Sequence, residues 1–174
     1  HNIESYKNLI TYVGGLQNEL RMVRLGSDVL PVYTEPTWCY FWRLPDVREY
    51  CERSLAPVGE LARNLNVRLS MHPGQFTVLA SDSDDIVNRS IEEFDYHVDV
   101  ASWMGFGQQF QDFKITVHIS GRKGPAGILN VHPRLSTEPR PTIPTHTADT
   151  PPRYQANIHF THNPHLVPYP PPSR

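Results

Sequence analysis

The sequence is poor in cysteine, nearly balanced in charge and without long apolar runs, and each shortage excludes a class of protein. Its 174 residues contain two cysteines, Cys39 and Cys51, too few for the disulfide framework of a small secreted domain, so we expect idle or buried thiols. A formal net charge of −2 does not indicate binding to nucleic acid or membranes through gross electrostatics. No stretch approaches the roughly 20 apolar residues that span a bilayer, and no apolar signal segment opens the chain. We therefore expect a cytoplasmic enzyme with no membrane partner.

Three segments alternate apolar and polar residues with the period of two that is typical of strands. They are residues 20–26, 67–72 and 114–120. Helical spacing marks four further segments, at residues 5–17, 46–65, 86–101 and 128–135. This order predicts an α/β fold, a partial TIM-like (β/α) barrel with three recognisable βα units and its chemistry at the carboxyl ends of parallel strands. Three units do not close an eight-stranded barrel, so we expect open sheet edges.

The long helix at residues 86–101 has an apolar face that we expect to be buried. The residues assigned to this face are Ile86, Ile91, Phe94, Val98 and Ala101. Several serines and aspartates precede the helix, and such residues suit the N-cap and the positive end of the helix dipole. In this assignment His97 lies on the polar side of the helix, and no role is expected of it.

The composition changes sharply near residue 139. More than half of the 17 prolines and four of the nine histidines follow Glu138, in a segment with few aliphatic residues. Such a segment buries too little apolar surface to offset the entropy that a chain loses on folding. We therefore divide the chain into a barrel-like part at residues 1–138 and an irregular or disordered, Pro/His-rich C-terminal tail at residues 139–174.

Two histidines lie at the ends of neighbouring predicted strands. His72 ends one strand just before a Pro-Gly break, and His118 lies near the end of the next. Neutral imidazoles at adjacent strand ends can share a divalent metal, which polarises a phosphoryl group and activates water. Gln75 and Phe76 follow on the loop, and an amide beside an aromatic ring suits recognition of distorted DNA. From spacing alone, the alternative that both histidines are satisfied structural residues stays open.

Four segments carry a resemblance to one known family. They are RLSMHPGQF at residues 68–76, VRLGSDVLP at 23–31, DIVNRSIEEFDYH at 85–97 and KITVHISGRKGP at 114–125. In these segments the sequence resembles the UV damage endonuclease family, and the similarity extends over about residues 2–138. The nine-residue segment at 68–76 looks like the family's signature and is its most specific part.

The resemblance implies a TIM-barrel hydrolase with a cluster of divalent metals, typically manganese. The family cuts damaged double-stranded DNA on the 5′ side of UV photoproducts and so starts excision repair. Carried over by position, His72 and His118 match family metal ligands. Glu35 falls where many members have a histidine ligand; a carboxylate also binds manganese, and the alternative is an exposed loop acid. Gln75 and Phe76 match the pair that probes the lesion, commonly Gln-Tyr in the family, so the ring is kept and a hydroxyl is lost.

After residue 136 the resemblance implies a strand that carries a glutamate ligand, followed by further Asp, His and Glu ligands, and this sequence departs from that pattern. No glutamate follows Glu138, and the tail has the character of a truncated or frame-shifted product. Two other functions therefore stay open: a catalytically dead fragment with at most weak DNA binding, and another TIM-barrel metal enzyme such as a sugar isomerase. The Gln75 and Phe76 pair argues against the isomerase. The resemblance implies no protein partner and assigns no catalytic acid or base.

Overall fold

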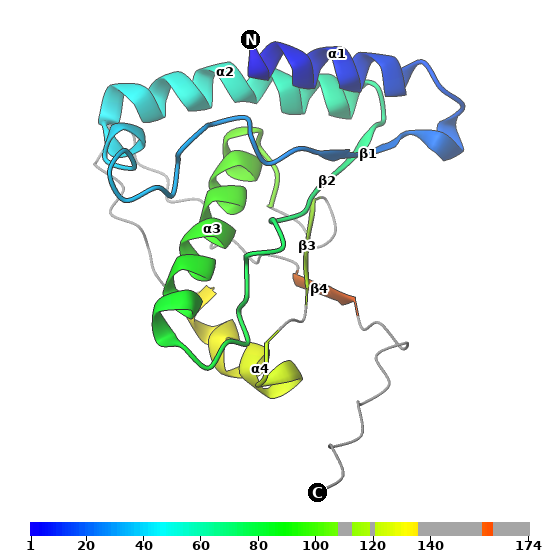
Figure 1. Cartoon of the computed structure of the whole chain (residues 1–174). Helices are drawn as coiled ribbons and strands as arrows, with labels where there is room; N and C mark the ends of the chain where they lie inside the picture. Colours follow the sequence, from blue (N-terminus) through cyan, green and yellow to red (C-terminus); the bar gives the residue numbers. More distant parts are fainter. Residues whose placement is uncertain (108–112, 119–120, 136–157, 162–174) are drawn as a thin grey trace, which may run out of the picture.

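A single parallel sheet organises the chain (Figure 1). The computed structural model describes residues 1–107, 113–118, 121–135 and, as backbone alone, 158–161. The strands are β1 (Met22–Leu25), β2 (Arg68–Met71), β3 (Lys114–His118) and β4 (Ile158–Thr161). Each strand pairs in parallel with the next one along the chain, so their carboxyl ends lie at the same edge of the sheet.

Helices connect the strands within the described residues. They are α1 (Asn2–Gly14), α2 (Pro45–Asn64), α3 (Asp84–Trp103) and α4 (Gly124–Leu135), with short 3-10 helices η1 (Asn18–Leu20) and η2 (Phe41–Arg43). In Figure 1, α1 and α2 lie side by side, and α3 runs from beneath them towards α4. Because β1, β2 and β3 are each followed by an α-helix, the three expected βα units and the partial TIM-like (β/α) barrel are confirmed.

Strand β4 lies in the segment for which composition predicts no strand. It pairs with β3 over four residues, from Ile115↔Ile158 to His118↔Thr161. An open strand edge offers backbone hydrogen bonds to almost any extended segment, and composition does not report this kind of pairing. The structure thus adds a short strand at residues 158–161 to the segment expected to be an irregular or disordered tail. The rest of residues 136–174 lies outside the described part of the chain, so a boundary at 138/139 stays a prediction.

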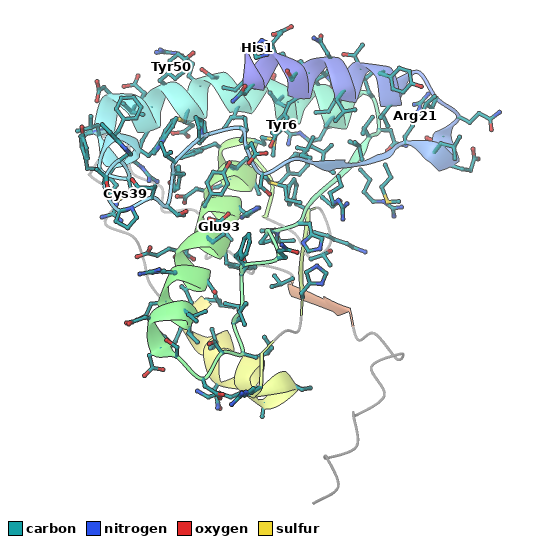
Figure 2. The ribbon with its side chains drawn as sticks, viewed as in Figure 1. His1, Tyr6, Arg21, Cys39, Tyr50 and Glu93 are labelled. Carbon is teal, nitrogen blue, oxygen red and sulfur yellow. The ribbon has the colours of Figure 1, made fainter. Side chains whose placement is uncertain are left out.

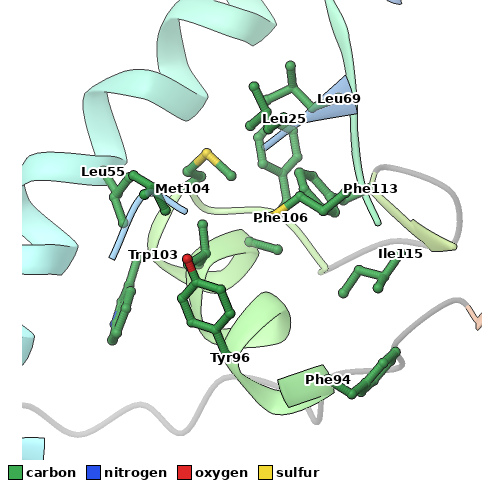
Figure 3. Close-up of a cluster of buried hydrophobic side chains, with 14 of the residues drawn as sticks. Leu25, Leu55, Leu69, Phe94, Tyr96, Trp103, Met104, Phe106, Phe113 and Ile115 are labelled. Atoms are coloured by element: carbon green, nitrogen blue, oxygen red, sulfur yellow. The ribbon is translucent and has the colours of Figure 1, made fainter. Parts of the chain in front are cut away.

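The hydrophobic core lies between the sheet and the helices (Figure 3). The strands bury alternate residues, as the period of two predicts: Leu25, Leu69, Met71, Ile115 and Val117. Full burial of side chains of this size contributes about 1.5–3 kcal/mol each. The residues between them on the strands are exposed or half-buried, so the opposite face of the sheet is polar and carries the histidines.

Cys51 is buried, as expected, whereas Cys39 is half-exposed, and both thiols are free. Among the helices of the described residues, none combines the length and apolar character needed to cross a bilayer.

Candidate metal centre

The carboxyl ends of β2 and β3 bring His72 and His118 together. Ser70 pairs with Lys114 and Met71 with Ile115, so both histidines lie on one face at the same end of the sheet. Their ring centroids are 4.4 Å apart, with 52° between the ring planes. This juxtaposition is the one that the strand-end spacing predicts.

The His72 imidazole is oriented by a hydrogen bond to the backbone carbonyl of the next residue. Its Nδ1 lies 2.7 Å from the carbonyl oxygen of Pro73, and because a carbonyl can only accept, Nδ1 carries the proton. The Nε2 lone pair is therefore available, as it is in most metal-bound histidines. Burial lowers the pKa of His72, and His118 and Arg24 act in the same direction against the opposing effect of the Pro73 bond. The ring is thus held in the neutral form that metals bind.

Glu35 is the predicted ligand that the structure does not bring to the histidine pair. Its carboxylate accepts hydrogen bonds from the backbone N–H groups of Thr37 at 2.9 Å and Trp38 at 3.1 Å, and from the Thr37 hydroxyl. These bonds close the turn that Glu35 opens. No group of three or more His, Cys, Asp or Glu side chains in the described residues could hold one metal ion. Two imidazoles therefore fit a divalent metal in donor type, and a complete ligand set needs further groups.

Gln75 and Phe76 occupy the tip of a β-turn beside the histidines. The N–H of Thr77 donates to the carbonyl of Gly74 at 3.0 Å, which closes the turn around the two residues. Pro73 and Thr77 are buried on either side, so the turn is anchored while its tip is exposed. Phe76 is 86% exposed, and such a ring gains nothing from the core of its own chain.

Ser27 contacts the His72 carbonyl and His97 contacts Ser27, and the sequence patterns revealed neither residue. His97 is fully buried, so its assignment to the polar side of α3 is wrong. Ile86, assigned to the buried face, is 43% exposed. The buried face instead runs through Val87, Ser90, Phe94, His97 and Ala101. That set has the 3-4 spacing of a helix face, but Ser90 and His97 are polar and break its apolar pattern. Polar side chains are buried only where hydrogen bonds satisfy them, and the sequence pattern does not show those bonds.

A sequence model of the family described as UV-endonuclease UvdE matches residues 1–130. The chain belongs to this family. It is 26% identical to the UV DNA damage endonuclease of Clostridium perfringens over 123 aligned residues. The alignment covers 71% of this chain and 27% of that relative. The chain is 31% identical to the UV-damage endonuclease of Schizosaccharomyces pombe over 103 aligned residues. The alignment covers 59% of this chain and 16% of that relative.

A solved structure agrees with the family assignment. The crystal structure of SacUVDE matches with a TM-score of 0.60 at 27% identity, over 76% of this chain and 42% of that one. The chain therefore spans less than half the length of these relatives.

Proposed function

We propose that this chain is a metal-dependent DNA repair endonuclease in which two histidines bind the metal and an exposed turn probes the lesion, and that it incises DNA 5′ to UV photoproducts. The observation that carries the proposal is the His72 and His118 pair, whose ring centroids are 4.4 Å apart. Family membership supports an endonuclease for UV-damaged DNA. The side of incision and the role of the metal belong to the proposal.

The residues that would hold the metal are His72 and His118. Glu35, the third expected ligand, would have to give up the hydrogen bonds of its own turn to join them. The proposed ion is divalent, with manganese as the first candidate, because imidazole and carboxylate groups both suit it. When bound, the ion would polarise phosphoryl oxygens and lower the pKa of a water molecule. Burial keeps the His72 ring neutral by lowering its pKa, and the bond from Nδ1 to the Pro73 carbonyl leaves Nε2 as the nitrogen with the lone pair.

The proposed substrate is damaged double-stranded DNA. The exposed Phe76 ring would stack on or wedge beside an unstacked base, and the Gln75 amide would hydrogen-bond to a base edge. Both residues lie on one anchored turn only a few residues beyond His72, so lesion contact and strand cutting would be coupled over a short distance. We propose no protein partner and a cytoplasmic location.

A second candidate function is a catalytically inactive chain that binds damaged DNA weakly. The observation that favours it is the lack, among the described residues, of a group of three metal-ligating side chains. A metal centre with two protein ligands leaves much of the coordination to water and binds weakly.

A nicking assay separates the two candidates. The full chain is incubated with UV-irradiated and unirradiated supercoiled plasmid in the presence of Mn²⁺, next to His72→Ala and a chelator control. Nicking that requires irradiation, Mn²⁺ and His72 supports the endonuclease. Equal background nicking by the wild type and His72→Ala, together with retention of the irradiated plasmid in a gel shift, supports the inactive binding chain.

A further inference from the structure

The segment after β1, residues 26–30, is tied to two helices through its backbone. The hydroxyl of Tyr6 on α1, labelled in Figure 2, donates to the carbonyl of Gly26. The hydroxyl of Tyr96 on α3 donates to the carbonyl of Ser27 at 2.5 Å. Both tyrosines are buried, so the backbone at Ser27 is fixed relative to the core.

The Ser27 side chain lies between two histidines. Its Oγ is 3.1 Å from the backbone carbonyl oxygen of His72 and 2.8 Å from Nε2 of His97. Nδ1 of His97 lies 2.7 Å from the carbonyl of Glu93, one turn earlier on α3, and therefore carries a proton. The remaining Nε2 is an acceptor in the neutral ring, which burial favours by lowering the pKa of His97. The single Ser27 proton is therefore divided between Nε2 and the His72 carbonyl, and the contact with Nε2 fixes the Ser27 side chain in the orientation that keeps its Oγ 3.1 Å from that carbonyl.

The His72 carbonyl belongs to a stiff part of the chain. The next residue is Pro73, whose ring fixes φ and restricts the preceding residue to extended conformations. Pro73 is also buried, and its carbonyl accepts the His72 Nδ1 proton at 2.7 Å. A hydrogen bond to the His72 carbonyl thus fixes the peptide plane between His72 and Pro73. The Pro73 carbonyl is fixed in turn, and it sets the direction of the His72 imidazole.

We propose that Ser27 and His97 are positioning residues, which orient the His72 imidazole by holding its backbone carbonyl. The consequence for metal binding rests on the proposed function, whereas the orientation of the ring is a property of the metal-free chain. Groups that orient a metal ligand from behind typically change metal affinity about 10- to 100-fold when they are removed. We expect this range for the loss of the Ser27 hydroxyl.

Two pairs of variants of the full chain test the proposal. Ser27→Ala removes the hydroxyl and Ser27→Thr keeps it. His97→Asn keeps a donor near Glu93 but does not reach Ser27, and His97→Gln keeps a polar atom near the former Nε2 position. Urea unfolding identifies the folded variants. If Ser27→Ala does not fold, Ser27→Cys replaces it, since a thiol has a similar shape and is a poor hydrogen-bond donor.

The first readout needs no metal. A long-range ¹H–¹⁵N spectrum of the wild type should show His72 as a single neutral tautomer with its proton on Nδ1. Ser27→Ala and His97→Asn should give mixed tautomers, and Ser27→Thr and His97→Gln should retain the wild-type pattern. An unchanged His72 tautomer in the folded Ser27→Ala chain would overturn the proposal.

The second readout is Mn²⁺ affinity by titration calorimetry. Ser27→Ala and His97→Asn should bind Mn²⁺ about 10- to 100-fold more weakly than the wild type, and the two conservative variants should bind within about threefold of it. If the wild type binds no Mn²⁺, the metal proposal fails, and the metal-free spectra still decide the positioning roles.

Discussion

Phe76 and Phe94 lie in opposite surroundings, and replacing each by alanine separates recognition of DNA from stability of the fold. Phe76 is 86% exposed and Phe94 is 0% exposed. A substitution at an exposed position changes the free energy of unfolding by about 0.5 kcal/mol or less, whereas truncation of a buried phenylalanine costs about 3–5 kcal/mol. We therefore expect Phe76→Ala to unfold at the wild-type urea concentration and Phe94→Ala to unfold far earlier.

The same two variants should differ in the opposite way in binding. Stacking of one base on an aromatic side chain contributes about 1–3 kcal/mol, which corresponds to a loss of about 5- to 150-fold in affinity when Phe76 is truncated. Fluorescence anisotropy with a labelled duplex that carries one UV photoproduct measures this loss. The salt concentration must be held constant, since phosphate contacts depend on it.

Two controls complete the experiment on Phe76. Phe76→Tyr keeps the ring and should bind the damaged duplex about as tightly as the wild type, and the undamaged duplex should show little difference between wild type and Phe76→Ala. Wild-type affinity of Phe76→Ala for the damaged duplex would refute the stacking role. A loss of stability as large as that of Phe94→Ala would refute the exposed placement of the ring.

Three further outcomes follow from packing and burial. A Cβ at Gly59 would lie 1.8 Å from the carbonyl oxygen of Met104, so Gly59→Ala should lose about 1–3 kcal/mol in urea unfolding despite a gain of about 1 kcal/mol in helix propensity. Burial lowers the pKa of His97 from 6.5, so just below pH 6.5 the unfolded chain binds more protons than the folded chain. The free energy of unfolding should therefore fall as the pH is lowered from about 7.5 to about 5.5, and it should fall less in His97→Gln. Burial raises the pKa of the Cys51 thiol to about 11, so iodoacetamide at about pH 8 should label half-exposed Cys39 in the native chain and both thiols in urea.

The sequence predicted those parts of the site that depend on strand periodicity. His72 and His118 could be placed together because parallel strands end at one edge and each histidine lies at a strand end. His97 could not be found in this way, since a buried polar residue breaks the apolar pattern and its partner Ser27 is 70 positions away. The position of Glu35 depends on turn hydrogen bonds within its own loop, which no periodicity reports. Strand β4 depends on an open edge rather than on its own composition.

Mn²⁺ binding by single and double variants of the two histidines tests the central claim most directly. Wild type, His72→Ala, His118→Ala and the double variant are titrated with Mn²⁺, and the amount of free ion is followed by electron paramagnetic resonance. If both rings hold one ion, each single variant should lose most of the affinity and the double variant should lose little more, because coupled residues are not additive. Wild-type affinity in either single variant, or two independent losses that add in the double variant, would contradict a shared site.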